Sequence, residues 1–546
     1  MSDPTTYNYI IIGSGAAGSV VAARLMEARA GSICVIEAGK DNNKWVVNVP
    51  AGFVRVLHNP EIMWQFKSEP TEFTAERSVY IPQGKILGGS TSINGLVYNR
   101  GQREDFDGWE SQGNSGWGYR DVLGYFKKSE TFDADTSEYR GDRGPLRIGY
   151  PDDKHPICDT FIDSVAGITG VKKHNDYNAG SQMGTGYYQR FIHNGKRENV
   201  ASRYLKPTLN LSGIKLMTNA MVSRIRFNDD KRAVGVDVIQ NGVKREINAS
   251  SEVLVCAGTV NSAALLQRSG VGDGSYLQSL GIDVTHDLPG VGENFQDHFF
   301  ARLAFRLQDD AKSLNMQARG WRLAREISRW ALGKHSILAW SPSIAYAFLN
   351  AETMQGRENH TNERPDFQYV FSHGSYRPGR IYELDSFPAV TCGFTQLRPY
   401  SSGHVRITSS DINSKPVVQP NYLQDPQDQA LAVLGVKFAR QIMSSPQFSA
   451  MVKYEMVPGE NAKSDDELLD FVRQTGNTGY HLVGTCKMGP KHDPMAVVDA
   501  NLHVHGLKGI RVIDASVMPS VTSSNTCAAA IMIGEKGADM ILFNKH

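Results

Sequence analysis

Three glycines near the start of the chain have the spacing of a dinucleotide-binding loop. Segment 13–18 (GSGAAG) directly follows the apolar run 9–12 and opens a helical stretch. Its glycines allow a tight turn and let backbone N–H groups approach a pyrophosphate at a helix N-terminus. Glu37 follows 24 positions after Gly13, at the end of the apolar run 33–36, where a carboxylate can accept hydrogen bonds from both ribose hydroxyls. The combination predicts a nucleotide cofactor, and the loop itself suits FAD and NAD equally.

A second glycine-rich segment, 84–95 (GKILGGSTSING), separates these two alternatives. Its adjacent glycines and its serine and threonine hydroxyls would offer donors to a phosphate and to the polar edge of a ring. Such a loop would be redundant for one pyrophosphate unless the cofactor is long, which favours FAD. From the residues alone, a flexible surface loop remains the alternative interpretation.

The same region resembles the first signature of the glucose–methanol–choline (GMC) oxidoreductase family, over segment 84–107. Segment 258–272 is similar to the second signature, with Ala263 where the family usually has proline. The resemblance covers essentially the whole chain, including GVGEN at 290–294. It is strongest to the bacterial branch that holds choline dehydrogenases, sorbose dehydrogenases and other alcohol dehydrogenases. It implies FAD-dependent oxidation of an alcohol to an aldehyde or ketone.

The resemblance assigns catalysis to two residues near the C-terminus, His481 in segment 480–486 and Asn525 in segment 523–526. Alcohol oxidation needs a group that takes the hydroxyl proton while a hydride leaves the same carbon, and a neutral imidazole suits this task. Asn525 cannot act as a base, but its amide can donate to the developing alkoxide. Asn525 also precedes a strong helix-forming stretch, so a role as N-cap is expected too, with the helix N-terminus directed at the flavin.

The loop spacing and the resemblance together imply a set of residues in contact with the cofactor, and they imply noncovalent FAD. Some relatives attach FAD through a histidine just before the asparagine of the first signature, but Ile93 stands there in this chain. The expected cofactor contacts are Gly13, Ser14, Gly15, Ala16, Ala17, Gly18, Glu37, Ala38, Gly88, Gly89, Asn94, Gly95, Val97, Val222, Ala257, Gly258, Tyr480, Asp514, Ala515, Asn525 and Thr526.

The resemblance also bears on the substrate. In choline-specific members it implies a carboxylate eight positions after the histidine that His298 matches, and an ungapped count from His298 reaches Arg306. A cation there would repel a trimethylammonium group. The expected substrate is therefore a primary alcohol other than choline, a polyol or sugar, or an aryl alcohol, and the expected electron acceptor is dioxygen or a quinone-type molecule. A hydroxynitrile lyase or an inactive flavoprotein of the same fold is the alternative.

The order of apolar runs around the first glycine loop is a βαβ opening, which predicts an α/β protein with a Rossmann-like FAD-binding domain. Residues 221–255 predict an antiparallel meander with a hairpin turn at Asn241-Gly242, and segment 252–258 predicts a separate strand that returns to the first domain. The meander strands are expected at 222–227, 233–239 and 243–247.

Region 299–473 predicts a second, substrate-binding domain built on an antiparallel sheet covered by helices. Its strands are expected at 366–371, 389–397 and 404–407, the last two joined by a hairpin turn at 399–403. Helices are expected after the N-cap Asp425 and at the capping box 464–467. The resulting division gives residues 1–149, 196–298 and 474–546 to the FAD-binding domain and residues 150–195 and 299–473 to the substrate domain, with the pocket between them.

Composition excludes some classes of partner. The chain has 546 residues with 58 Lys and Arg against 57 Asp and Glu, a net charge of +1, so bulk charge would not drive binding to nucleic acid. The six cysteines form no CxxC pair and have no histidine at zinc spacing, which predicts reduced thiols and no metal. No signal peptide and no apolar run of bilayer length is recognised, so a cytoplasmic protein without a transmembrane segment is expected, with peripheral membrane contact left open.

Overall fold

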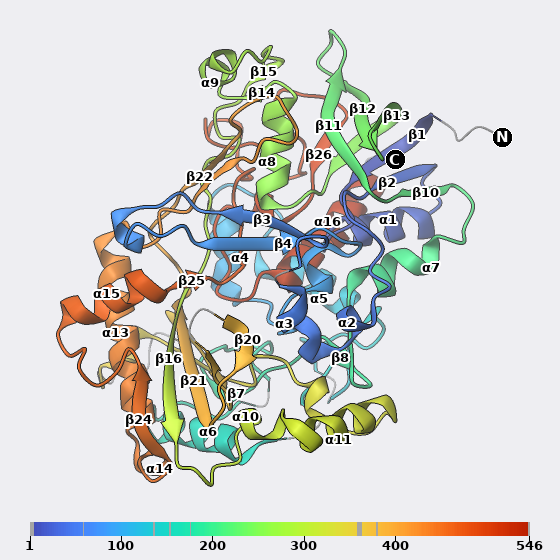
Figure 1. Ribbon diagram of the computed structural model, residues 1–546. Helices are drawn as coiled ribbons and strands as arrows, with labels where there is room; N and C mark the ends of the chain where they lie inside the picture. The colour runs from blue at the N-terminus through green and yellow to red at the C-terminus, as the bar shows by residue number, and fades with distance from the viewer. Residues whose placement is uncertain are drawn as a thin grey trace.

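Two large β-sheets, each covered by its own helices, form the framework of the fold (Figure 1). The computed structural model describes residues 5–57, 59–134, 137–151, 154–174, 176–357, 363–377 and 380–543. Each sheet has a hydrophobic core of its own. The arrangement confirms the predicted α/β class with a second, antiparallel sheet.

The first sheet is built around β1, whose apolar run is buried on both faces. Its strand order is β10-β2-β1-β13-β12-β11, and β26 pairs with β13 outside this path. The pairs β1–β2, β1–β13, β2–β10 and β13–β26 are parallel, as expected of a doubly covered α/β sheet. The strands are β1 Thr6–Ile12, β2 Ile33–Ile36, β10 Ile214–Met217, β11 Ala220–Phe227, β12 Ala233–Gln240, β13 Val243–Val255 and β26 Ile510–Val512.

Two helices link the glycine loop to the end of the chain. Helix α1 (Gly18–Glu27) packs against α16 (Cys527–Phe543), and α16 packs against α5 (Tyr119–Ser129). Helix α16 is buried along most of its length because its N-terminal half is almost wholly apolar. The C-terminal helix therefore begins close to the loop that opens the chain.

One long strand replaces two predicted ones. The predicted meander is present as β11, β12 and the start of β13, but residues 243–255 form a single strand. Its first half pairs antiparallel with β12, and its second half pairs parallel with β1. The prediction of two strands was wrong here because the exposed, polar middle of β13 lacks the apolar pattern of a buried strand.

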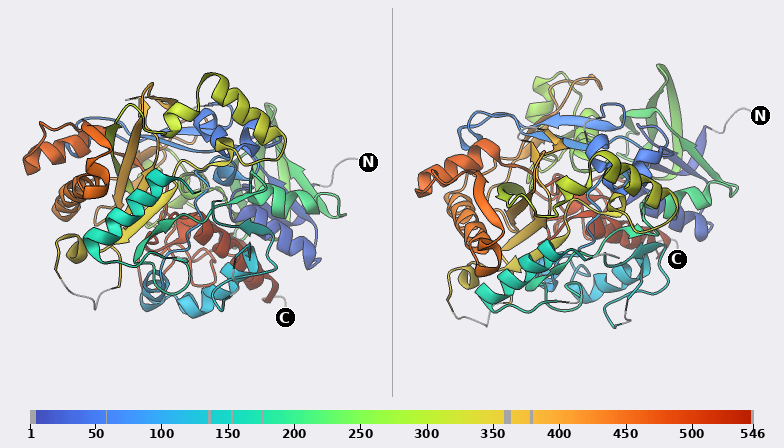
Figure 2. Two further views of the ribbon diagram at one scale, coloured as in Figure 1. Left: turned by 90° about the horizontal axis from the view of Figure 1, so that it is seen from below. Right: turned by 60° about the horizontal axis from the view of Figure 1, so that its bottom comes forward.

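The second sheet is antiparallel and has the strand order β24-β16-β21-β18-β17-β7, with β25 paired to β16. Helices α6 and α13 pack on one of its faces and share its core (Figure 2). The other face is open to the cavity described below. The elements are β7 Gly184–Tyr187, β16 Phe299–Leu307, β17 Ala345–Leu349, β18 Phe367–Ser372, β21 Ala389–Gln396, β24 Val452–Val457, β25 Asn477–Thr478, α6 Pro156–Thr169, α13 Pro426–Met443 and α15 Asp465–Thr475.

Local signals in this region were correct for the helices and partly wrong for the strands. Asp425 caps α13 by accepting from the Gln427 N–H, and Ser464 with Glu467 forms the capping box of α15. The predicted strand at 404–407 exists as β22 (His404–Arg406), but it pairs only with β23 (Val417–Gln419). Segment 399–403 is therefore not a hairpin turn within the large sheet, because β21 pairs with β16 and β18 instead.

Within the described ranges, no helix is both long and apolar enough to cross a membrane. All six cysteines are free thiols.

Candidate active site

A cavity of about 880 Å³ lies between the two sheets. One end is formed by the first glycine loop and the ends of β1 and β2, and the other by the open face of the second sheet. The hairpin of β3 (Met63–Lys67) and β4 (Tyr80–Gly84) contributes a further wall. Residues of both glycine-rich segments line the cavity, and so do His481 and Asn525.

The three glycines of the first loop serve different purposes. Gly13 has φ +98°, and a Cβ there would lie 2.4 Å from the carbonyl oxygen of Cys256. A Cβ on Gly18 would lie 2.1 Å from the carbonyl oxygen of Gly13. Gly15 lines the cavity and has no heavy atom within 4 Å of its Cβ position. Two glycines thus allow close backbone packing, and the third leaves space for a ligand.

The second glycine-rich segment lies directly on the first. Gly89 has φ +53°, and a Cβ there would come within 2.8 Å of the Cα of Gly15. Ser90 and Thr91 line the same cavity. Two glycine loops on one elongated cavity fit a cofactor longer than a single pyrophosphate, so the residues present suit FAD.

Glu37 is held rigidly at the end of β2. Its Oε2 accepts from the Ser14 N–H at 3.0 Å and from the Ser14 hydroxyl at 2.6 Å, and its Oε1 accepts from the Gly39 N–H at 2.8 Å. Burial raises the pKa of Glu37, and these hydrogen bonds oppose that rise. The carboxylate lines the cavity at the position expected of a ribose acceptor.

Asp514 is the second carboxylate in the cavity wall. Its Oδ2 accepts from the Gly258 N–H at 2.9 Å and from the Ser262 hydroxyl at 2.6 Å. These bonds tie the turn after β26 to the start of α8 (Thr259–Arg268), so the last strand and the second family-like signature form one wall.

The structure places most of the predicted residues on the cavity and three behind it. Gly18, Ser14 and Gly88 do not line the cavity: Gly18 packs on Gly13, and the Ser14 carbonyl accepts from the Gly88 N–H at 3.0 Å. The predicted residues that line it are Gly13, Gly15, Ala16, Ala17, Glu37, Ala38, Gly89, Asn94, Gly95, Val97, Val222, Ala257, Gly258, Tyr480, His481, Asp514, Ala515, Asn525 and Thr526.

His481 lies in a continuous chain of hydrogen bonds with Asn525, His298 and the carbonyl of Leu397. The Nδ2 of Asn525 lies 2.9 Å from the Nε2 of His481. On the far side of the ring, the two Nδ1 atoms of His481 and His298 are 2.8 Å apart. The Nε2 of His298 lies 2.9 Å from the carbonyl oxygen of Leu397.

This chain determines where the protons lie. The carbonyl of Leu397 can only accept, so the Nε2 of His298 carries a hydrogen and its Nδ1 accepts from the Nδ1–H of His481. The Nε2 of His481 is then an unprotonated acceptor that faces Asn525. Burial lowers the pKa of His298 to about 4, and burial together with His298 lowers the pKa of His481. Both rings are therefore neutral at pH 7.

The backbone beside His481 is fixed by a buried carboxylate. Asp297 accepts from the His481 N–H at 2.8 Å, from the Thr478 hydroxyl at 2.5 Å and from the Tyr422 hydroxyl at 2.5 Å. Tyr480 sits between these contacts with φ +64°, a left-handed conformation that is unfavourable for a tyrosine. The bonds to Asp297 offset this strain and hold the turn that aims the imidazole.

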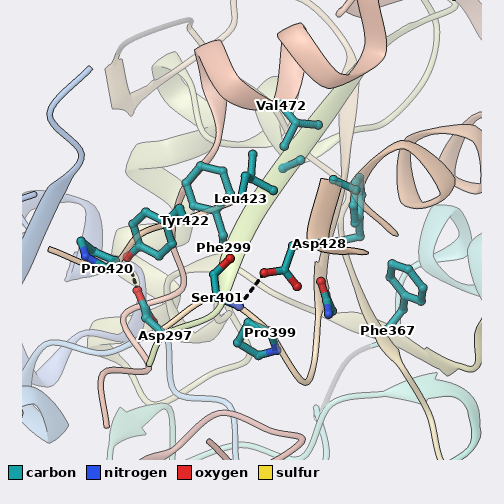
Figure 3. A pocket seen from close by; sticks show the side chains of 14 residues that line it. Asp297, Phe299, Phe367, Pro399, Ser401, Pro420, Tyr422, Leu423, Asp428 and Val472 are labelled. Carbon is teal, nitrogen blue, oxygen red and sulfur yellow. Dashed lines mark hydrogen bonds between the residues drawn. The ribbon is translucent and has the colours of Figure 1, made fainter. Parts of the chain in front are cut away.

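A separate small pocket lies beside this carboxylate, and Figure 3 shows Tyr422 directed at Asp297 across its edge. Its volume is about 30 Å³, the room of a single water molecule, so it cannot take a substrate.

Asn525 does not cap the C-terminal helix as predicted. Helix α16 begins at Cys527, and the Asn525 side chain instead donates to His481 and accepts from the Nε2 of Gln368 at 3.2 Å. The amide is used across the cavity, between β18 and the histidine turn, so the N-cap interpretation was wrong.

Of the two arginines on β16, Arg302 lines the cavity and Arg306 does not. Both lie on β16, but Arg306 donates to the carbonyl oxygen of Pro388 and pairs with Asp309, away from the cavity. Arg302 lines the cavity next to Phe300. The ungapped count from His298 therefore does not reach a cavity residue.

Sequence reasoning also missed His298 as a partner of His481 and missed the substrate-end wall. The only signal for His298 is its place in the GMC-like motif that ends at Asp297-His298. Residues on alternate positions of β16, β18 and β21 face the cavity, and the period-two pattern of a strand could have indicated them. They are Phe300, Arg302, Gln368, Val370, Ser372, Thr391 and Gly393.

Comparison with known proteins identifies the family. Family models for GMC oxidoreductase match residues 7–300 and 399–534. The chain is 34% identical over 544 residues to an alcohol dehydrogenase [acceptor] of Pseudomonas putida, which covers 98% of this chain and 96% of that protein. It is 36% identical over 542 residues to an oxygen-dependent choline dehydrogenase of Brucella suis biovar 1, with 98% and 95% covered.

Two solved structures have the same fold. Pyridoxine 4-oxidase from Mesorbium loti superposes with a TM-score of 0.87 at 26% identity and 99% coverage of both chains. An Aspergillus oryzae RIB40 formate oxidase gives a TM-score of 0.89 at 24% identity, with 100% of this chain and 99% of that chain covered, a likeness in fold alone. The chain belongs to the GMC oxidoreductase family and is an FAD-dependent oxidoreductase that acts on CH–OH groups.

Proposed function

We propose that the protein oxidises an alcohol other than choline to an aldehyde or ketone, with His481 as the base and Asn525 as the donor that holds the substrate oxygen. The observation that carries this proposal is the pair His481 Nε2 and Asn525 Nδ2, 2.9 Å apart on the cavity wall. An alcohol oxygen that approaches both atoms from the cavity would accept from Asn525 and donate to His481.

His481 is suited to the role of base because its Nε2 is unprotonated and fixed. The hydrogen bond from its own Nδ1–H to His298 stabilises the ring in this tautomer, and the N–H bond to Asp297 fixes its backbone. The hydroxyl proton of the alcohol moves to Nε2 while the carbon–hydrogen bond breaks with both of its electrons.

Asn525 is suited to stabilise negative charge on the substrate oxygen. Gln368 donates to its Oδ1, which leaves the Nδ2 hydrogens directed at His481 and the cavity. A preorganised donor of this kind lowers the free energy of a developing alkoxide.

FAD, when bound, supplies the acceptor for the hydride that leaves the carbinol carbon. Residues of both glycine loops, Glu37 and Asp514 would hold it, and Ile93 in the cavity wall offers no nucleophilic atom, so we expect noncovalent binding.

We propose that residues 1–149, 196–298 and 474–546 form the FAD-binding domain and that residues 150–195 and 299–473 form the substrate domain. Electrons then pass to dioxygen or to a quinone-type acceptor, and oxygen uptake compared with dye reduction distinguishes the two.

Anaerobic mixing of the yellow holoprotein with a panel of alcohols tests the function. We expect one or more alcohols to bleach the flavin absorbance, and choline to be a poor reductant. Cleavage of a cyanohydrin with the flavin still oxidised would indicate a lyase and contradict the proposal.

A further inference from the structure

We propose that the substrate alcohol carries an anionic group, such as a carboxylate, which Arg302 binds. This inference rests on the proposed function, because it concerns the substrate end of the same cavity. Arg302 lies on β16, whose side chains alternate between two environments. Ala301, Leu303 and Phe305 are buried in the core of the second sheet, whereas Phe300 and Arg302 face the cavity.

The surroundings of Arg302 make room for its guanidinium but provide no counter-charge. Its neighbour across the sheet is Gly393, where a Cβ would lie only 3.3 Å from the Arg302 Cγ. Its Cζ lies 5.7 Å from the centre of the Phe300 ring. In the part of the chain that the structure describes, no carboxylate forms an ion pair with Arg302 within 4 Å.

The acidic residues of the cavity wall lie at the other end and are already engaged. Glu37 is bonded to Ser14 and Gly39, and Asp514 to Gly258 and Ser262. A substrate that enters the cavity therefore meets an unpaired cation at its substrate end. A guanidinium binds a carboxylate through two parallel, charge-assisted hydrogen bonds.

Arg302 is close enough to the catalytic pair for one small molecule to reach both. The Phe300 ring is near both, with its centre 6.2 Å from that of His481 and 5.7 Å from the Arg302 Cζ. Burial raises the pKa of Tyr480, the residue before His481, and the positive charge of Arg302 opposes that rise. An aryl or short-chain alcohol could therefore place its hydroxyl at His481 and its carboxylate at Arg302.

Three matched aryl alcohols test the inference in the holoenzyme: para-(hydroxymethyl)benzoate, its methyl ester and para-(trimethylammonio)benzyl alcohol. We expect kcat/KM to be at least about tenfold higher for the carboxylate than for the ester, and lowest for the cation. Arg302→Gln should bring the ratio of carboxylate to ester close to one. Arg306→Gln, on the same strand but outside the cavity, should leave this ratio as in the wild type.

A binding measurement separates this inference from the proposed function. Benzoate and benzamide are titrated into the holoprotein while the flavin absorbance is followed, and benzoate should bind more tightly in the wild type but not in Arg302→Gln. Equal binding of the two, or a wild-type ratio near one for the alcohols, would overturn the anion site. If no alcohol reduces the flavin while benzoate still binds through Arg302, the proposed function is wrong and the anion site stands.

A second inference comes from α11 (Gly320–Ala331), which lies at the lower edge of the molecule in Figure 1. We infer that this helix docks the protein onto an anionic lipid surface. One stripe of the helix faces the protein: Glu326 is buried, and the half-buried Trp330 donates from its Nε1 to the carbonyl oxygen of Gly195 at 2.8 Å.

Apolar and basic side chains of α11 face outward. Trp321 is 69% exposed and Ile327 is 50% exposed, and Leu332, just after the helix, is 72% exposed. A basic stripe of Arg322, Arg325 and Arg329, at spacings of three and four residues, runs beside Trp321 and Leu332. A helix that presents tryptophan and leucine next to arginines fits the boundary between lipid headgroups and acyl chains.

The charge of the segment selects an anionic surface. Residues 319–334 contain five basic residues and one acidic residue, Glu326, in a chain whose total charge is only +1. A second copy of the chain would present the same cations to this stripe and repel it, so a negatively charged bilayer is the better partner.

Co-sedimentation of the holoprotein with vesicles tests this inference. Vesicles with phosphatidylglycerol should bind the protein, and pure phosphatidylcholine vesicles should bind it at least about tenfold more weakly. Trp321→Ser with Leu332→Ser should release it from the anionic vesicles, and Tyr454→Ser, an exposed aromatic on β24, should not. No binding to anionic vesicles, or self-association that the same double variant abolishes without any effect on vesicle binding, would overturn it.

Discussion

The two ends of the cavity differ in whether backbone atoms or side chains form the wall. At the nucleotide end the wall consists of backbone atoms. Glycines form it either because another part of the backbone occupies the space of a Cβ, as at Gly13, or because that space is open to a ligand, as at Gly15. At the substrate end it consists of side chains that project from the open face of a sheet, such as Arg302 and Gln368. The first end must recognise one invariant cofactor, and the second can change its specificity by exchange of single side chains. Variants at the two ends should therefore fail in different ways.

The largest effect is expected at the substrate end. His481→Ala removes the proton acceptor but leaves both glycine loops intact, so flavin content should be normal. The rate of flavin reduction should fall by about 10²–10⁴-fold, as for loss of a general base. Rapid mixing under anaerobic conditions measures this step apart from reoxidation. A near-normal rate with full FAD occupancy would place the base elsewhere.

Asn525→Ala should have the next largest effect on chemistry. It removes the donor to the substrate oxygen, and the flavin reduction rate should fall by about 10²-fold. Because the Asn525 side chain does not cap α16, thermal stability and FAD content should change little. A large loss of stability with unchanged chemistry would instead restore the capping role.

At the nucleotide end an added methyl group should remove the cofactor rather than the chemistry. Gly13→Ala introduces a Cβ 2.4 Å from the Cys256 carbonyl oxygen at φ +98°, and we expect a loss of about 1–3 kcal/mol in stability and a reduced ratio of FAD to protein. Gly108→Ala is the matched control, because Gly108 lies within α4 (Arg103–Ser111) with no atom within 4 Å of its Cβ position. It should raise stability by about 0.5–1 kcal/mol. Equal FAD content in both variants would contradict the account of the loop.

The smallest expected effect is that of pH. His481 acts as a base only when its Nε2 is unprotonated, and burial together with His298 lowers its pKa. The flavin reduction rate should therefore be constant above about pH 6.5 and fall as the pH decreases. Asp297, whose pKa burial raises to about 6, would lose its charge in the same range and loosen the His481 backbone. A rate that falls as the pH rises from 7 to 9 would contradict a neutral base.

The same difference between the two ends explains what the sequence could predict. The nucleotide end was predictable because glycine spacing and a carboxylate at a strand end are local patterns, and nearly all of those residues line the cavity. At the substrate end the resemblance supplied His481 and Asn525, but His298, Gln368 and Arg302 were not predictable, because they come together only through the pairing of β21 with both β16 and β18 and the return of the C-terminal segment. The continuous β13 was missed for a related reason, since its polar middle becomes a strand only by pairing with neighbours on either side.

The central claim is that an alcohol gives its hydride to the flavin while His481 takes its proton. The most direct test follows the anaerobic bleaching of the flavin by an alcohol and by the same alcohol with deuterium on the carbinol carbon. The account predicts bleaching by both, slower with deuterium, and almost none in His481→Ala with full FAD content. Bleaching at the same rate by both alcohols, unaffected by His481→Ala, would contradict it.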